Sequence, residues 1–302
     1  MSPGQSGVAI TPFRDLDVPG VDVRVFEGGA ELPDGADEAE LYVLPYDFAL
    51  PHLEHIARMP KLRHVQTLTA GYEHVLPYLP AGVSLSNARG VHDASTAELA
   101  VGLMIASLRG IDDFARAQPS GEWLFAPRPS LADRTVLIVG YGSIGQALEH
   151  RLAGFEVDVV RVARRPRDGV HTMDDLPGLL PKADVVVLLV PLTAETEKLV
   201  DAGFLARMRD HALLVNVARG KVVDTDALLA ELESGRLRAA LDVTEPEPLP
   251  AQHPLWRAPG CLISPHVGGA TSAFLPRARR LVVEQLTRYA AGEPLAHVVV
   301  PA

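Results

Sequence analysis

Cysteine is nearly absent from this sequence: Cys261 is the only one among 302 residues. A single cysteine excludes an intrachain disulfide framework and is typical of a protein from a reducing compartment. Because Cys261 stands in an apolar run, we expect a small buried core residue rather than a nucleophile. The first residues show neither the charged nor the apolar stretch of a secretory signal, so the sequence predicts a cytoplasmic protein.

The sequence also has few basic residues relative to acidic ones and has no long apolar run. Lysine and arginine number 28 against 38 aspartates and glutamates, which gives a formal net charge of −10. This balance argues against a nucleic acid or an anionic membrane surface as the partner. No run approaches the roughly 18 apolar residues of a membrane-spanning helix, so we predict no membrane span. The length of 302 residues and the hydrophobic content of 47% fit a globular protein of about two domains.

One short segment has the composition of half a metal site. His52-Leu53-Glu54-His55 holds two histidines and a glutamate. No complementary cluster of ligands stands nearby in the sequence, so we expect an exposed helix face here and no bound metal.

What the sequence does contain, near its centre, is a glycine-rich turn between a strand and a helix. The apolar run Thr135–Val139 leads into Gly140, Gly142 and Gly145 at G-x-G-x-x-G spacing, and a helical pattern follows at once. Gly140 would permit the tight turn, Gly142 the approach of a pyrophosphate, and Gly145 the close packing of the helix on the strand. The helix N-terminus would attract the phosphates. We therefore expect a dinucleotide site, the alternative being a purely structural turn.

The end of the next strand bears on which dinucleotide binds. An NAD-type fold places an acidic residue about 20 residues after the glycine turn, to bind the ribose 2′-hydroxyl. Here the residue 18 positions after Gly145 is Ala163, followed by Arg164 and Arg165. A small residue and two guanidinium groups would bind a 2′-phosphate, which an acid would repel. The sequence favours NADP(H) over NAD(H), unless the two arginines merely lie on a solvated turn.

Short apolar strands alternate with helical patterns along the whole chain, for example at residues 21–26, 41–44 and 184–190. This alternation predicts an α/β fold with doubly wound parallel sheets. A nearly all-apolar helix is expected from residue 93 to residue 108, buried between layers or at a subunit contact. The loop that follows carries Trp123, which we expect to be a packing or dimer anchor.

Three polar residues follow strand-like runs in the second half of the chain. Arg219 comes after residues 213–217, Glu247 shortly after 241–243, and His266 after 262–264. Since the carboxyl ends of parallel strands share one edge of a sheet, these side chains are expected to converge beside a bound nicotinamide. Each alone would more simply be a surface arginine, a solvated acid or a structural histidine. Their combination with the glycine turn favours a site.

Six segments together resemble the signatures of the D-isomer-specific 2-hydroxyacid dehydrogenase family, and they cover nearly the whole chain. They are Thr69-Ala70-Gly71, Asn87-Ala88-Arg89-Gly90, residues 191–196 (PLTAET), 216–224 (NVARGKVVD), 241–248 (LDVTEPEP) and 264–269 (SPHVGG). The resemblance implies a hydride transfer between the dinucleotide and a small 2-keto or 2-hydroxy acid, such as glyoxylate or hydroxypyruvate.

The resemblance also implies residue roles. Arg219 would hold the substrate carboxylate and polarise the keto oxygen, His266 would donate a proton to that oxygen, and Glu247 would orient the imidazole and stabilise its protonated form. Family spacing selects Glu247 over Glu245 for this last role. Backbone N–H groups around Ala70 and Gly71 would bind the other side of the carboxylate. With Arg164 and Arg165, the cofactor-binding set is Gly140, Gly142, Ser143, Ile144, Gly145, Val217, Asp242 and Gly268.

In domain terms, the resemblance implies a discontinuous, flavodoxin-like substrate domain made of residues 1–92 and 273–302. Residues 93–272 would form a Rossmann cofactor domain, with a hinge near residues 91–95 and 270 and a homodimer through the cofactor domain. Ala163, Thr244 and Glu73 depart from the common family pattern. Two alternatives stay open: an NAD-dependent enzyme similar to phosphoglycerate dehydrogenase, which would need a basic pocket, and a non-catalytic dinucleotide-sensing binding protein on the same fold.

Overall fold

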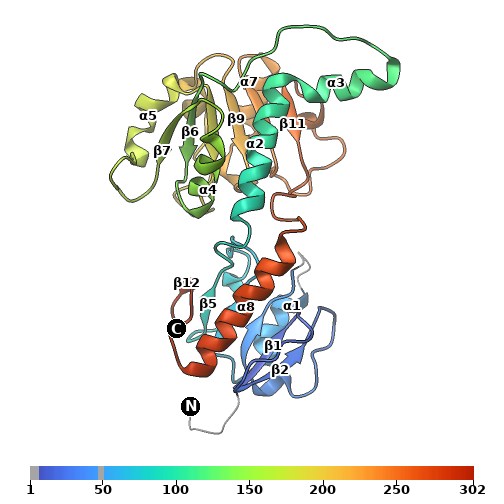
Figure 1. Ribbon diagram of the computed structural model, residues 1–302, viewed down its shortest axis with the longest axis vertical. Helices are drawn as coiled ribbons and strands as arrows, with labels where there is room; N and C mark the ends of the chain where they lie inside the picture. Colours follow the sequence, from blue (N-terminus) through green and yellow to red (C-terminus); the bar gives the residue numbers. More distant parts are fainter. Residues whose placement is uncertain (1–6, 47–50) are drawn as a thin grey trace. The chain divides into compact units, whose positions relative to one another are not determined.

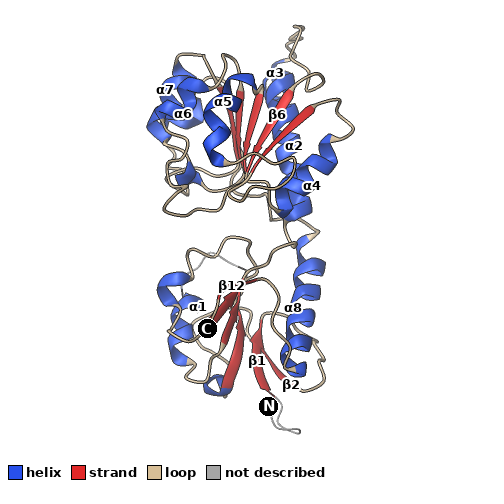
Figure 2. Cartoon of the chain, turned by 90° about the vertical axis from the view of Figure 1, so that its left-hand side faces the viewer, coloured by secondary structure: helices blue, strands red, loops and turns tan. Residues whose placement is uncertain are grey.

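The computed structural model describes residues 7–46 and 51–302, which form two compact α/β units. One unit comprises the described residues up to His92 together with Ser272–Ala302, and the other comprises Asp93–Thr271. Figures 1 and 2 show that each unit is built on one sheet with helices on both faces. The predicted architecture of two doubly wound α/β domains is thereby confirmed.

The first unit has a six-stranded sheet in the order β12-β5-β4-β3-β1-β2. Its strands are β1 (Gly7–Thr11), β2 (Val21–Val25), β3 (Ala39–Val43), β4 (His64–Gln66), β5 (Ser84–Ser86) and β12 (Val298–Val300). The first five pair in parallel in the flavodoxin-like order 2-1-3-4-5. Strand β12 adds to the edge in the antiparallel sense. The C-terminal segment therefore forms one edge of the sheet.

Neighbouring residues of a strand point to opposite sides of the sheet, and here the residues on both sides are apolar. Leu41 and Val43 pack with α8 (Phe274–Ala291), while Tyr42 faces the other core. Short helices cover that second face. They are η1 (Ala36–Glu38), α1 (Pro51–Glu54), η2 (His55–Arg58) and η3 (Leu76–Tyr78).

The histidines of the segment His52–His55 are buried, so the expectation of an exposed helix face is wrong. His52 and His55 are each 4% exposed. The Nε2 atom of His55 lies 3.0 Å from the carbonyl oxygen of Gly29, and its ring meets the edge of Phe26. A helix of four residues has no clear polar face, and burial was decided by the sheet below it. Among the described residues, no group of three or more His, Cys, Asp or Glu side chains is arranged to hold a metal.

The second unit has a six-stranded, wholly parallel sheet in the order β11-β10-β9-β8-β6-β7. Its strands are β6 (Thr135–Val139), β7 (Asp158–Val162), β8 (Val185–Leu188), β9 (Leu213–Asn216), β10 (Arg238–Leu241) and β11 (Cys261–Ile263). Beyond β7, His171 makes a single parallel bridge to Val162. The third strand of the first Rossmann half is thus reduced to one bridge. The strand order reverses between β6 and β8, where ligands bind in open α/β sheets.

Helices cover both faces of this second sheet. The α2 and α4 helices pack with Ile138 and Val187, and the helices between β7 and β10 pack with Leu137 and Val186. The helices are α2 (Asp93–Arg109), α3 (Ile111–Ala117), η4 (Gln118–Ser120), α4 (Ser143–Leu152), η5 (Met173–Asp175), α5 (Leu176–Leu179), η6 (Leu180–Lys182), α6 (Ala202–Arg207), η7 (Gly220–Val222), α7 (Thr225–Glu233) and η8 (Pro254–Arg257).

Two sequence expectations for this unit meet different outcomes. Cys261 lies half-buried on the edge strand β11 and packs against the core, as expected. Burial raises the pKa of its thiol to about 12, so the thiol stays protonated and is a poor nucleophile. Trp123, by contrast, is 91% exposed and does not anchor packing within the chain. Figure 1 shows α3 and the loop after it extending away from the rest of this unit.

Among the described helices, no single one is long and apolar enough to cross a bilayer. The bent pair Asp93–Arg109 and Ile111–Ser120, which turns by 66°, meets the requirement by length and composition alone.

Burial of His64 makes the stability of the first unit depend on pH. His64 is 2% exposed on β4, with Nδ1 2.7 Å from Ser84 Oγ, and burial lowers the pKa of the imidazole from 6.5 to about 4. Because the unfolded chain then binds a proton more readily, the free energy of unfolding falls as pH drops from about 6.5 to about 4. The loss is about 3 kcal/mol in total. Urea unfolding by far-UV circular dichroism should show a smaller loss in His64→Asn; identical pH profiles would contradict this.

Candidate active site

The glycine turn between β6 and α4 has close backbone contacts at two of its three glycines. A Cβ on Gly140, whose φ is +107°, would lie 2.5 Å from the backbone carbon of Leu189 at the end of β8. A Cβ on Gly145 would lie 3.1 Å from the carbonyl oxygen of Gly140. A Cβ on Gly142, in contrast, would meet nothing within 4 Å. The fold therefore requires glycine at position 140, leaves little room for a side chain at 145, and leaves open space at Gly142, where a ligand can approach.

The helix after this turn begins at Ser143, directly beyond Gly142. The first backbone N–H groups of an α-helix have no partner within the helix, and they carry its positive dipole end. A turn of this shape, with an open glycine and a helix N-terminus side by side, fits the pyrophosphate of a dinucleotide.

Several cationic side chains surround Tyr141, the residue between the first two glycines. Arg161 and Tyr141 both bond to the carboxylate of Glu149, which lowers the pKa of that carboxyl chiefly through its bond to Arg161. Arg167 donates to the carbonyl oxygen of Tyr141 at 2.5 Å and lies 5.5 Å from the centre of its ring. Arg167 therefore lies over the glycine turn. The sequence reasoning missed it, although it closes the same arginine-rich run.

The two arginines predicted to read the 2′-phosphate are exposed at the end of β7. Arg164 lies near Glu195: the pKa of Glu195 is lowered mainly by its hydrogen bond with Thr193, and to a smaller degree by the charge of Arg164. Arg164 thus faces the loop after β8, which is the neighbour of β6 at the switch point. Arg164 and Arg165 both follow β7 directly, at the carboxyl-end edge of the sheet.

The register of the sheet brings the later polar residues to the same edge. Asn216, Leu241 and Ile263 are partners across β9, β10 and β11. Arg219 therefore follows its strand by three residues and His266 follows its strand by three, with the β10 loop between them. The three segments therefore leave the sheet from neighbouring strands.

The His266 loop is organised by the carboxylate of Asp242. Asp242 is 3% exposed, and its Oδ1 accepts hydrogen bonds from Ser264 Oγ at 2.6 Å and from the N–H of Val267 at 2.9 Å. Its Oδ2 accepts from the N–H of Gly268 at 2.9 Å. A buried charge needs such donors to offset the loss of water. Asp242, expected only to lie near the nicotinamide, thus holds the loop in place.

At the centre of this loop, His266 and Glu247 form a direct pair between Nδ1 and Oε1. The two side chains are 28% and 36% exposed, so they line a surface that a small molecule can reach. His266 has a φ of +53°, a left-handed conformation that costs a non-glycine residue about 1–2 kcal/mol. Its N–H donates to the carbonyl oxygen of Asp242 at 2.8 Å, which helps to stabilise this conformation.

Arg219 is held by its own turn after β9. Asn216 Nδ2 donates to the carbonyl oxygen of Arg219 at 2.9 Å, while Asn216 Oδ1 accepts from the N–H of Ala218 at 3.0 Å. A Cβ on Gly220 would lie 1.8 Å from the carbonyl oxygen of Thr244, so only glycine lets the β9 turn approach the β10 loop this closely. Asn216 is a second residue that the sequence analysis did not assign to the site. It could have been found because it opens the segment 216–224, which also contains Arg219.

The predicted substrate loop, which includes Ala70 and Gly71, belongs to the first unit and follows β4. Three of its carbonyl oxygens accept hydrogen bonds: that of Thr69 from Thr67 Oγ1, that of Ala70 from Asn87 Nδ2, and that of Gly71 from Thr69 Oγ1, at 2.8, 2.7 and 2.6 Å. With the carbonyl groups bonded internally, the loop has a defined conformation from which N–H groups can bind an anion.

Comparison with known proteins identifies the family of this chain. A family model for the NAD-binding domain of D-isomer specific 2-hydroxyacid dehydrogenases matches residues 101–268. Glyoxylate reductase from Thermofilum pendens is 35% identical over 249 residues, which is 78% of this chain and 74% of that protein. This chain belongs to the D-isomer specific 2-hydroxyacid dehydrogenase family. It is accordingly an oxidoreductase with an NAD-type dinucleotide-binding domain, as the sequence predicted.

Solved structures of the family superpose on the full chain. One is a D-isomer specific 2-hydroxyacid dehydrogenase from Xanthobacter autotrophicus Py2 in complex with NADPH and MES, with 30% identity, a TM-score of 0.81 and 98% of each chain covered. Another is an NADPH-dependent glyoxylate/hydroxypyruvate reductase from Sinorhizobium meliloti in complex with NADP and sulfate, with 27% identity, a TM-score of 0.83 and 98% of each chain covered.

The glycine turn separates structural from ligand-binding glycines in a testable way. Gly140→Ala should lower stability by roughly 2–4 kcal/mol, because its Cβ meets the backbone of Leu189 and its φ is positive. Gly142→Ala should melt within about 2 °C of the unaltered protein, yet bind NADPH at least about tenfold more weakly, because its Cβ enters the ligand space. Differential scanning fluorimetry and fluorescence titration measure the two effects. Unchanged NADPH affinity in Gly142→Ala would rule out this placement of the pyrophosphate.

Proposed function

We propose that this enzyme is an NADP(H)-dependent, D-specific reductase of a small 2-keto acid of the glyoxylate or hydroxypyruvate type. The observation that carries the proposal is the His266–Glu247 pair at the ligand-binding edge of a dinucleotide-binding sheet. Glu247 follows β10 and His266 follows β11, while Arg219 follows the adjacent strand β9. Relatives with the names glyoxylate reductase and glyoxylate/hydroxypyruvate reductase support the substrate class.

The chemistry assigned to the residues follows from their geometry. The bound dinucleotide supplies the hydride. With Nδ1 of His266 directed at Glu247, whose carboxylate orients the ring, the proton given to the keto oxygen is the one on Nε2. The planar guanidinium of Arg219 binds the substrate carboxylate and polarises the keto group. In the reverse direction, neutral His266 accepts the proton of the hydroxyl group.

The remaining binding roles are also part of the proposal. N–H groups at Ala70 and Gly71 bind the substrate carboxylate, and those of Ser143 and Ile144 bind the pyrophosphate. Val217, which is 7% exposed, and Gly268 border the nicotinamide together with Asp242. Gly268 suits this position because a Cβ there would lie 3.0 Å from Asp242 Oδ2.

The preference for NADP(H) over NAD(H) is supported by charge. Ala163 stands where an acid would repel a 2′-phosphate, and exposed Arg164 and Arg165 follow it directly. Arg167 bonds to Tyr141 in the glycine turn, and Arg164 lies near Glu195 in the loop after β8. The similar structures from Xanthobacter autotrophicus and Sinorhizobium meliloti contain NADPH and NADP.

A homodimer formed through the cofactor domain is supported by the projecting segment after α3. Trp123 and Phe125 are 91% and 88% exposed, with Phe114 nearby in the chain at 39%. Large apolar side chains left in water at this density mark an association surface. We also propose a cytoplasmic location, on the single cysteine of the chain.

The function is tested by NADPH oxidation with a panel of 2-keto acids that includes glyoxylate, hydroxypyruvate and pyruvate. Glyoxylate or hydroxypyruvate should be reduced, and His266→Ala should lower kcat by about 10²–10⁴-fold while NADPH affinity stays within about twofold. Glu247→Gln should also lower kcat, because the imidazolium loses its counter-charge. No turnover with any keto acid, despite tight NADPH binding, would refute the enzyme assignment to this substrate class.

The cofactor preference is tested by the double variant Arg164→Ala plus Arg165→Ala. Loss of two charge-assisted hydrogen bonds should weaken NADPH binding by about 100-fold and leave NADH binding within about threefold. Arg207→Ala, an exposed arginine on α6, is the control and should change neither affinity. An equal loss for both cofactors in the double variant would disprove recognition of the 2′-phosphate.

The dimer is tested by sedimentation of Trp123→Ser plus Phe125→Ser. Removing two large apolar side chains from the interface should shift the protein from dimer to monomer at micromolar concentration. The melting temperature of the monomeric subunit should not fall. Val298→Ser, an exposed apolar residue of the first unit at 44%, serves as the control. A monomeric unaltered protein would exclude the assembly.

A further inference from the structure

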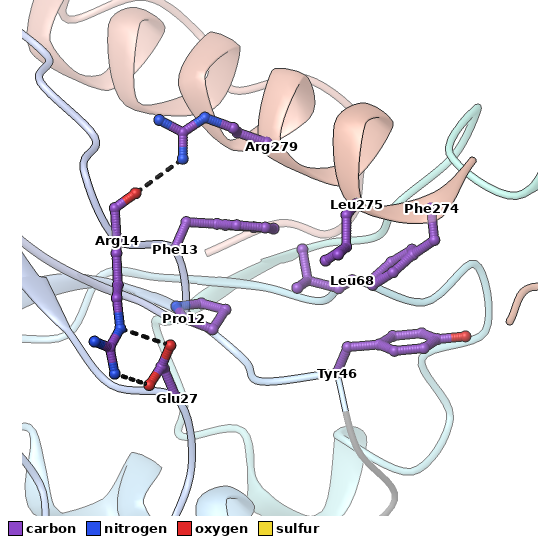
Figure 3. A pocket seen from close by; sticks show the side chains of 9 residues that line it. All are labelled: Pro12, Phe13, Arg14, Glu27, Tyr46, Leu68, Phe274, Leu275 and Arg279. Atoms are coloured by element: carbon purple, nitrogen blue, oxygen red, sulfur yellow. Dashed lines mark hydrogen bonds and ion pairs between the residues drawn. The ribbon is translucent and has the colours of Figure 1, made fainter. Parts of the chain in front are cut away.

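Three aromatic rings from distant parts of the chain meet in the first unit. Tyr46 follows β3, His92 directly precedes α2, and Phe274 begins α8. The ring centres of Tyr46 and Phe274 are 4.0 Å apart, and the imidazole of His92 lies 5.4 Å from Phe274 with only 9° between the planes. Figure 3 shows Tyr46 and Phe274 beside Leu68 at one end of a cavity of about 360 Å³.

The imidazole in this cluster also bonds to the backbone that leads into the substrate loop. His92 is 6% exposed, and its Nε2 lies 2.7 Å from the carbonyl oxygen of Leu68. Because a carbonyl oxygen can only accept, Nε2 carries a proton and donates it. Leu68 is the residue directly before Thr69-Ala70-Gly71, so this bond fixes the point from which the loop departs.

The ring that makes this bond is itself held in orientation. Tyr46 stacks on His92 at 5.7 Å with 24° between the planes, and Phe274 stacks on it at 5.4 Å. Stacked rings restrict rotation of the imidazole about its side-chain bonds, so the N–H keeps its direction towards Leu68. Aliphatic side chains in place of Tyr46 and Phe274 could fill the same space, but they would not hold the plane of the His92 ring and so would not orient its N–H group.

We propose that His92 is a positioning residue for substrate binding. Its Nε2–H holds the Leu68 carbonyl, so that the loop Thr69–Gly71 presents its N–H groups to the carboxylate of a 2-keto acid. The Tyr46 and Phe274 rings hold the imidazole for this purpose. This inference rests on the proposed function of the loop, and the bond acts on substrate binding rather than on hydride or proton transfer.

The kinetic test compares two substitutions of the same residue. His92→Phe keeps a ring for stacking but removes the donor; it should raise KM for glyoxylate about tenfold, with kcat and KM for NADPH within about twofold. His92→Gln returns an N–H donor at a similar reach and should bring KM back to within about threefold. A His92→Phe variant with unchanged KM for glyoxylate would overturn the proposal.

A matched control exists elsewhere in the same unit. His55 is also buried, its Nε2 lies 3.0 Å from the carbonyl oxygen of Gly29, and its ring packs on Phe26 at 5.5 Å. His55→Phe should lower the melting temperature about as much as His92→Phe, but leave KM for glyoxylate unchanged. An equal rise in KM for both variants would show a general loss of stability instead of a positioning role.

A second measurement does not depend on activity. Hydrogen–deuterium exchange of the peptide covering residues 69–72 should be about tenfold faster in His92→Phe and unchanged in His55→Phe. If the unaltered enzyme reduces no 2-keto acid, the proposed function fails, while this exchange experiment still decides the positioning role. Equal exchange of the loop in His92→Phe and the unaltered protein would overturn it.

Discussion

The carboxylate of Asp242 is the constraint on which the loop carrying His266 depends. A buried carboxylate is costly unless donors surround it, and here three donors from residues 264–268 converge on its two oxygens. The loop must therefore curl around the end of β10, and His266 takes up a left-handed conformation at the tip of that curl. The strain at His266 is offset by the satisfied charge beneath it. The position of His266, the proposed proton donor, is thus set by a residue that need not touch the substrate.

Close approach of backbones is the second constraint on this site. Gly140 and Gly220 each stand where the turn after one strand touches the backbone after its neighbour, and a Cβ at either would overlap carbonyl or amide atoms. Because neighbouring strands of a parallel sheet end at one edge, such contacts pull their loops into a single layer. The ligand-binding edge is dense for this reason, and Gly142 is the point in the turn that stays open.

Histidines of the chain illustrate how burial divides one residue type into different roles. His55 and His92 are nearly inaccessible, and each donates from Nε2 to a backbone carbonyl oxygen. His64 is buried, and burial lowers the pKa of its imidazole to about 4. His266 keeps contact with solvent and has a carboxylate partner, which suits a group that exchanges protons with a ligand. The difference lies in the surroundings.

The sequence by itself determined the alternation of strands and helices, the glycine turn between a strand and a helix, and the position of Arg219, Glu247 and His266 shortly after apolar strands. These features depend on local spacing: a glycine pattern between strand and helix, and polar residues placed just after apolar runs. Since parallel strands end at one edge, local spacing was enough to predict that these segments lie side by side.

Tertiary structure alone decided the burial of His52 and His55, the place of Arg167 over Tyr141, the use of Asp242 as a loop anchor, and the stacking of His92 with Phe274. Each depends on contacts between residues far apart in the chain, so no local pattern encodes it. A short helix such as Pro51–Glu54 has too few residues to show an apolar face. The local sequence around an aspartate after a strand is also the same whether its carboxylate binds a ligand or backbone N–H groups. Which partner it meets is settled only when the neighbouring loops pack against it.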